Sequence, residues 1–185
     1  MPDTVSSERR ALVPHPDTPC AAVRALTLTF ERPTPALLTL HYALDADLEA
    51  LRIPEPRPPA RTDGLWQHTC VEAFIGQSDG RTYWEYNFSP SGAWAAYQFS
   101  DYREGMAPLM KGAAPVISTR ETSGSLVLSV AVDLSWISRA TGAELVLGAS
   151  AVIETRERVL SYWALKHPAG KPDFHQVVSR IVPLA

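Results

Sequence analysis

Apolar and polar residues alternate along much of this chain with a period of two, which is typical of β-strands that bury one face. Within residues 24–31, Leu26, Leu28 and Phe30 alternate with two threonines, and residues 36–44 follow a similar pattern. The short segment between them contains two prolines, through which a helix could not continue. We therefore expect two strands joined by a turn.

The same reasoning extends along the rest of the chain. Further strands are expected at about residues 65–76, 81–89, 93–100, 116–121, 125–132, 144–154, 159–166 and 177–182. Turn signals separate them, for example Asp79-Gly80. One short helix is expected near 134–140, because Asp133 can cap its start and Gly142 can follow its end. Many short strands with hardly any helix predict an all-β fold, an antiparallel β-sandwich, with a closed barrel as the alternative.

The domain organisation is expected to be simple. Residues 1–21 are polar and contain prolines, so we expect a lead-in that precedes a single β-sandwich domain over residues 22–185. Residues 45–63 contain a proline-rich stretch that predicts a long extended connection. A connection of this length is either a rim over a binding site or a surface crossover.

Composition narrows the classes of partner. The chain of 185 residues has a formal net charge of −3, 45% apolar and 20% charged residues, so there is no broad electrostatic reason to bind nucleic acid or an anionic membrane. Neither a secretory signal nor an apolar run of roughly 20 residues is visible in the sequence, and we expect a cytoplasmic protein. Two cysteines, Cys20 and Cys70, are expected to be free thiols, with a single bridge as the alternative.

The strand expected at residues 81–89 divides into two distinct faces. Trp84, Tyr86 and Phe88 share one face, which we expect to pack in the core, while Glu85 and Asn87 project from the other. A charge and an amide within an aromatic-rich strand favour a functional role for this second face.

The preceding strand divides less cleanly. Its better core set is Val71, Ala73 and Ile75, which leaves a more polar face. That polar face carries Trp66, His68 and Glu72. Because a hairpin joins the two strands, we expect their polar groups to gather on one patch of the sheet.

A sugar offers an apolar ring face, on which aromatic side chains stack, and many hydroxyls that polar side chains can bind. We therefore predict a ligand-binding site made by Trp66, His68, Glu72, Glu85, Asn87, Arg103, Trp163, Lys166 and His167. The competing interpretation places the tryptophans in the core, the polar residues on a solvated face and Arg103 in an ion pair.

Catalytic motifs are largely missing from the sequence. It contains no HExxH, GxSxG, GxGxxG or GxxxxGK[ST] motif, so nucleotide-dependent and hydrolase-fold chemistry lack support. Glu72 and Glu85 leave a glycoside hydrolase as a lesser alternative. His167 and His175 share a segment with Asp173, but packing by its prolines is preferred to a metal site, and no metal is expected.

Three blocks of sequence carry a resemblance to a known family. Residues 65–75, 83–97 and 101–106, with weaker support from 127–136 and 167–175, resemble the bacterial DOMON-like proteins, which are related to family 9 carbohydrate-binding modules. The resemblance implies a β-sandwich whose concave sheet face binds a sugar, and it implies binding rather than turnover.

Other branches of the same family bind haem. Met and His or Lys would then be the axial ligands, and Met106, Met110, His167 and His175 are the residues of those types considered. We expect no cofactor, with haem as the alternative, and a glycan or another small molecule as the ligand. The oligomeric state is left open.

Overall fold

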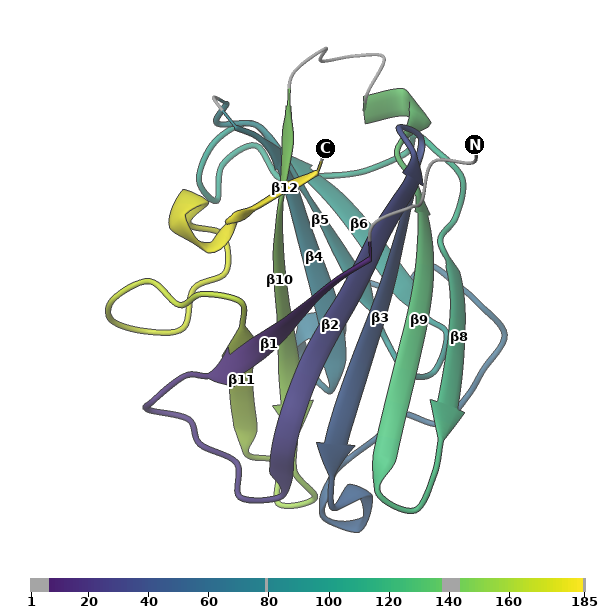
Figure 1. The fold of residues 1–185 in the computed structure, drawn as a ribbon, viewed down its shortest axis with the longest axis vertical. Coiled ribbons are helices and arrows are strands. Elements are labelled where there is room, and N and C mark those ends of the chain that lie inside the picture. The colour runs from purple at the N-terminus through teal and green to yellow at the C-terminus, as the bar shows by residue number, and fades with distance from the viewer. Residues whose placement is uncertain (1–6, 79, 138–143, 185) are drawn as a thin grey trace.

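A computed structural model describes residues 7–78, 80–137 and 144–184, and these form a twelve-stranded antiparallel sheet (Figure 1). The strand order is β7-β6-β5-β4-β10-β11-β1-β2-β3-β9-β8, and β12 pairs with β10 beside β11. One half of the sheet contains β1 (Glu8–Pro14), β2 (Val23–Thr34), β3 (Leu37–Ala46), β8 (Val116–Glu121) and β9 (Ser125–Asp133). The other half contains β4 (Cys70–Gln77), β5 (Tyr83–Phe88), β6 (Trp94–Phe99), β7 (Ala107–Pro108), β10 (Leu145–Glu154), β11 (Leu160–Ala164) and β12 (Val182–Leu184).

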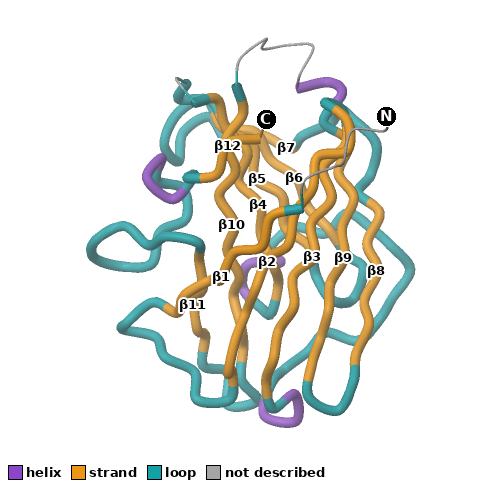
Figure 2. Tube along the Cα trace, in the orientation of Figure 1, coloured by secondary structure: helices purple, strands orange, loops and turns teal. Residues whose placement is uncertain are grey.

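The sheet curls so that its two halves face one another across a single main core (Figure 2). Leu28, Leu40 and Leu128 enter this core from the half that contains β1–β3, and Ile75 and Leu147 enter it from the other half. This architecture confirms the expected all-β antiparallel fold. It takes the form of one curled sheet, because β1 connects the two layers.

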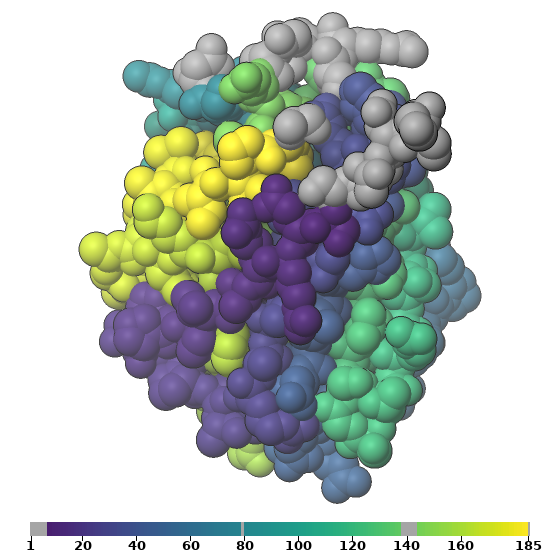
Figure 3. All heavy atoms as spheres, in the orientation of Figure 1, coloured from purple at the N-terminus to yellow at the C-terminus, as the bar shows by residue number. Residues whose placement is uncertain are grey.

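Strand β1 joins the two halves. It pairs with β2 from Glu8↔Phe30 to Leu12↔Leu26, and then with β11 at Val13↔Ala164. Residues 8–14 are thus part of the sheet, whereas the sequence placed them in a lead-in. Leu12 is the one apolar side chain of β1 buried in the core, and the pairing rests mainly on backbone hydrogen bonds, so side-chain pattern carries little signal here. In Figure 3 the purple N-terminal residues lie against the yellow C-terminal segment.

Most of the expected strands are present, and the main differences lie at β4, near the C-terminus and at β7. Strand β4 begins only at Cys70, because Leu65–Gln67 forms a 3₁₀ turn, η2, after Gly64, whose φ of 79° is left-handed. Near the C-terminus Val177–Ser179 is another 3₁₀ turn, η3, so that β12 covers only Val182–Leu184. Strand β7 was not expected, since two residues are too few to show an alternation.

The expected helix is present where it is described. Residues 135–137 are helical, and the Asp133 carboxylate accepts a hydrogen bond from the Ser135 backbone N–H at 2.9 Å, as expected for a helix start. Residues 138–143, including Gly142, lie outside the described residues. Within the described part of the chain, no helix is long and apolar enough to cross a membrane. Cys20 and Cys70 are free thiols.

The long connection over residues 45–63 contains a short 3₁₀ turn, η1 (Leu48–Ala50), and then passes the strand ends of the half that contains β4–β6 and β10. Leu51 bridges to Thr155, and Arg61 bridges to Trp94 at the start of β6. At its end, Asp63 accepts a hydrogen bond from the Tyr97 hydroxyl at 2.6 Å. The connection therefore delivers η2, with Trp66, to the outer face of the half sheet that contains β4–β6.

Candidate functional site

The central hairpin, β4 and β5, has the two faces that the sequence indicated. Cross-strand pairs are Glu72↔Asn87 and Phe74↔Glu85, so these four residues share the face that points away from the main core. Val71, Ala73, Ile75, Trp84, Tyr86 and Phe88 lie on the opposite face, in the main core. The predicted register of this hairpin is confirmed.

The outer face of this hairpin is not an open surface. A second apolar cluster covers part of it, with Phe74, Tyr83 and Phe99 from the strands and Phe174 from the C-terminal segment. Glu72 and Glu85 are 3% and 5% exposed, so both carboxyl groups lie in a largely dehydrated setting. Buried carboxyl groups are uncommon without a paired cation or a functional reason.

The Glu72 carboxyl is held by the neighbouring strand. Ser150 on β10 donates its hydroxyl hydrogen to Glu72 Oε2 at 2.8 Å. Burial, followed by the nearby charge of Glu85, raises the pKa of Glu72 to about 8. Near neutral pH this carboxyl therefore keeps its proton and can act as a hydrogen-bond donor as well as an acceptor.

Glu85 is the diagonal neighbour of Glu72 across the hairpin. Its Oε1 accepts a hydrogen bond from Asn87 Nδ2 at 2.7 Å, while burial raises its pKa above the usual value. Asn87 is fully buried, and its Oδ1 has no hydrogen-bond partner among the described residues. Asn87, two residues along the same strand and on the same face, therefore orients the Glu85 carboxyl group.

His175 lies above Glu85 and is neutral. Tyr83 Oη accepts the Arg103 backbone N–H at 3.2 Å, which leaves its own hydrogen for His175 Nδ1 at 2.8 Å. The ring hydrogen of His175 then sits on Nε2, which faces Glu85 Oε2 at 3.8 Å. Burial, with the charge of Arg103 as a further cause, lowers the pKa of His175 to about 4.

Together these groups border a cavity of about 480 Å³ on the outer face of the sheet, which we call the carboxyl cavity. Its polar lining includes Glu72, Glu85 and His175. Its apolar and aromatic lining is Trp66, Phe74, Phe99, Met106, Val152, Tyr162, Pro172 and Phe174. Arg103, Lys171 and Asp173 complete it. The cavity size and this mixture suit a small organic ligand with both an apolar face and polar groups.

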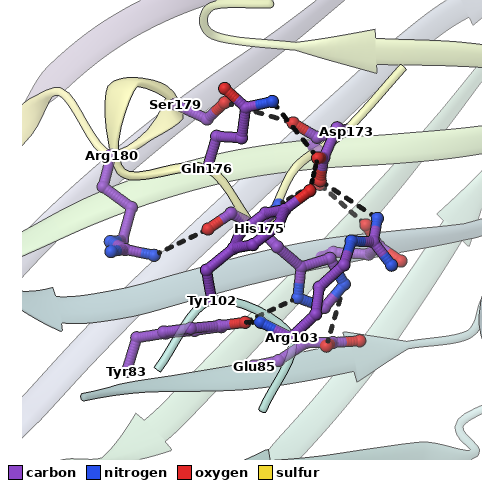
Figure 4. A network of polar contacts seen from close by, with 11 residues as sticks. Tyr83, Glu85, Tyr102, Arg103, Asp173, His175, Gln176, Ser179 and Arg180 are labelled. Atoms are coloured by element: carbon purple, nitrogen blue, oxygen red, sulfur yellow. Dashed lines mark hydrogen bonds and ion pairs between the residues drawn. The ribbon is translucent and has the colours of Figure 1, made fainter. Parts of the chain in front are cut away.

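Asp173, on the lining of the carboxyl cavity, accepts hydrogen bonds that join two segments of the chain (Figure 4). Its carboxylate accepts hydrogen bonds from Arg103 Nη2 at 3.0 Å, from the Tyr102 hydroxyl and from Gln176 Nε2 at 3.3 Å. Burial alone would raise the pKa of Asp173, but the bonds from Tyr102, from the His175 backbone N–H and from Arg103, with the Arg103 charge, hold it below its usual value. The segment after β6 is thereby tied to the C-terminal segment that covers the sheet.

The structure brings together some of the predicted site residues. Trp66, Glu72, Glu85 and Arg103 line the carboxyl cavity, and Asn87 donates a hydrogen bond to Glu85. Arg103 also makes an ion pair with Asp173 at 3.0 Å, as the competing interpretation expected, and its contact with a ligand stays a prediction.

Other predicted residues lie elsewhere. His68 turns away to Glu154, with 2.8 Å between Nδ1 and Oε2. Trp163 packs in the main core and donates its indole N–H to Ser161, because the pleat of β11 directs Tyr162 toward the cavity instead. Lys166 is exposed, and the His167 ring bonds the Val13 carbonyl of β1.

Several cavity residues were not among the predicted site residues. Phe74 shares its face with Glu72, so the same period of two could have identified it. Tyr162 follows from the correct pleat of β11. Phe174 and His175 reach the cavity only because the C-terminal segment folds back over the sheet, which no local pattern indicates.

Two of the four residues considered for haem, Met106 and His175, also line the carboxyl cavity. Met110 is largely exposed, and His167 is bonded to β1. Among residues 7–78, 80–137 and 144–184, no group of three or more His, Cys, Asp or Glu side chains could hold a metal ion.

Comparison with known proteins informs the fold more than the site. No protein-family profile matches the chain, and no curated protein is significantly similar in sequence. The structure is similar to the crystal structure of a protein from Bacteroides uniformis that has been proposed to bind carbohydrate. The TM-score is 0.64 at 12% sequence identity, over 95% of this chain and 84% of the other. At this identity the similarity shows a shared fold.

Proposed function

We propose that this protein binds a carbohydrate in the carboxyl cavity and does not alter it chemically. The observation that carries the proposal is the pair Glu72 and Glu85, which are buried in neighbouring strands yet border a cavity with aromatic walls. Carboxyl groups in a dehydrated site form strong hydrogen bonds with sugar hydroxyls, and aromatic faces accept the apolar face of the ring. The shared fold with a proposed carbohydrate-binding protein supports the same class of ligand.

The protonation states fit a neutral sugar. Glu72 keeps its proton near neutral pH, and Glu85 Oε2 faces the Nε2 hydrogen of neutral His175. These three side chains of the carboxyl cavity therefore offer hydrogen-bond donors and acceptors that a neutral sugar can use. We also propose that the protein is related to the DOMON-like proteins and family 9 carbohydrate-binding modules. We propose, in addition, that it is located in the cytoplasm.

Calorimetric titration with a panel of mono- and disaccharides tests the proposal. For a sugar that binds the wild type, we expect Glu85→Ala and Trp66→Ala to weaken the affinity by about tenfold or more, since the first removes a buried hydrogen-bonding group and the second an aromatic wall of the cavity. Glu121→Gln, on the exposed edge strand β8, is the matched control and should leave the affinity unchanged. The absence of heat with every sugar, or unchanged affinity in both cavity variants, contradicts the proposal.

Haem is the second candidate, because Met106 and His175 line one cavity. Hemin added to the wild type would then give a Soret band that disappears in Met106→Ala and His175→Ala. A spectrum that equals free hemin eliminates this candidate and leaves the carbohydrate proposal intact.

Hydrolysis of a glycoside is less well supported. Glycosidases need one carboxyl group as acid and a second as base or nucleophile beside the scissile bond, whereas Glu72 and Glu85 are 3% and 5% exposed and each is held by a neighbouring side chain. Turnover of chromogenic glycosides by the wild type, lost in Glu72→Gln and Glu85→Gln, would reverse this assignment.

A further inference from the structure

A buried arginine lies on the same sheet face, beyond the carboxyl cavity. Arg180 directly follows η3 and is 8% exposed. A side chain at Gly148 would approach its Cγ to 3.2 Å, and a side chain at Gly76 would approach its Nε to 2.8 Å. Gly76 pairs with Tyr83 on the next strand. Because Gly148 and Gly76 have no side chains, the Arg180 side chain can lie directly across β10 and β4. Its guanidinium group ends over Tyr83 on β5.

The guanidinium group is held in place but is not neutralised. Its carbon lies 4.6 Å from the centroid of the Tyr83 ring, and Nη1 donates to the His175 carbonyl at 3.2 Å (Figure 4). Its Nε is fully buried without a partner, and no carboxylate among the described residues is within ion-pair distance of Arg180. Burial lowers the pKa of Arg180 below its usual value. A buried cation without a counter-ion is costly, so such a group commonly serves a ligand.

Arg180 borders a cleft of about 540 Å³, which we call the arginine cleft. Ser78, Arg81 and Gln176 lie on the same lining and carry further hydrogen-bond donors. Arg81 already pairs with Asp101 at 2.9 Å, and it is mostly exposed. Asp101 is the one carboxylate on the described lining, against two guanidinium groups, and His175 is neutral there. Among the described lining residues, guanidinium groups therefore outnumber carboxylates.

We infer that the arginine cleft binds a small oxyanion, namely a carboxylate, phosphate or sulfate group, at Arg180. Planar guanidinium groups bind these anions through paired N–H donors, and only one of the five donors of Arg180 has a protein acceptor among the described residues. Arg81, Gln176 and Ser78 are the side chains that would contact the rest of the anion.

This site is separate from the carbohydrate proposal but adjoins it. Tyr83 and His175 line the arginine cleft, while His175 also lines the carboxyl cavity. An anion next to Arg180 would change the electrostatic setting of the Tyr83–His175 hydrogen bond, which positions the Nε2 hydrogen above Glu85.

Titration of the wild type with phosphate, sulfate, acetate and chloride at matched ionic strength tests the inference, with calorimetry and two-dimensional amide NMR as readouts. We expect at least one oxyanion, but not chloride, to bind and to shift the amide signals of Tyr102 and Gln176. The preferred anion identifies the carboxylate, phosphate or sulfate class. Binding equal to that of chloride, or shifts confined to residues outside the arginine cleft, overturns the inference.

Variants assign the contact to Arg180. Arg180→Gln should weaken oxyanion binding by at least about tenfold, and Arg81→Gln by roughly threefold, because a partly neutralised surface charge contributes less. Arg120→Gln on the exposed strand β8 is the control and should bind as the wild type does. Wild-type affinity in Arg180→Gln refutes the site. If Arg180→Gln does not fold, the wild-type NMR result and Arg81→Gln decide.

Discussion

The two halves of the curled sheet use their faces differently. In β3 and β9, buried positions alternate with more accessible ones, so that one face meets the core and the other meets solvent. In β4 and β5 nearly every residue is buried, because the C-terminal segment covers the outer face as well. The half buried on both faces is also the half that carries Glu72, Glu85 and Asn87. Polar groups retained inside a doubly buried strand are therefore the ones on which the proposed binding site rests, rather than polar groups on an alternating strand.

The main core should be the most sensitive part of either half. Leu40 on β3 is fully buried in it, and Leu40→Ala should lower the free energy of unfolding by about 2–5 kcal/mol through lost burial and a cavity. His41→Ala, the next residue on the exposed face of the same strand, should change it by less than about 0.5 kcal/mol. Urea denaturation measures both. Equal effects would show that β3 is not one-sided.

Ionisation of Glu72, in the doubly buried half, should lower the free energy of unfolding as pH rises. Its pKa is about 8 in the folded protein against a usual value of 4.5, so between these values the folded state holds more protons and wild-type stability falls with increasing pH. Glu72→Gln should therefore be more stable than the wild type by about 1–4 kcal/mol at pH 8.5, and similar to it at pH 4. Denaturation at both pH values measures the difference. A difference independent of pH would show that Glu72 is not protonated in the fold.

Asp173 should control how firmly the C-terminal segment covers the outer face. Asp173→Ala removes the acceptor of Tyr102, Arg103 and Gln176, and we expect a loss of about 1–2 kcal/mol in unfolding free energy. Hydrogen exchange of amides in residues 171–180 should quicken, while exchange in β3 and β9 stays as in the wild type. Uniform quickening throughout the sheet would mean that this cover is not a separate unit.

The exposed face of the other half should tolerate loss of an ion pair. Arg24 and Asp45 approach to 2.6 Å, but both side chains are more than half exposed. Asp45→Asn should change the free energy of unfolding by less than about 0.5 kcal/mol, since solvent screens such pairs. Thermal denaturation at low and high salt checks this. A loss of about 2 kcal/mol or more would show that polar contacts on this face are shielded from solvent, as they are on the outer face of β4 and β5.

The sequence was sufficient wherever a pattern of period two reports on local burial. It predicted the all-β antiparallel fold, most strands, and the register that turns Glu72, Glu85 and Asn87 away from the main core, because side-chain direction alternates along any strand. Tertiary structure alone decided that β1 joins the halves, that Trp163 faces the core while Tyr162 faces the cavity, and that Phe174, His175 and Arg180 lie over β4 and β5. Those placements depend on backbone pairing and on contacts between distant segments. Neither kind of interaction produces a periodic pattern of apolar and polar residues in the sequence.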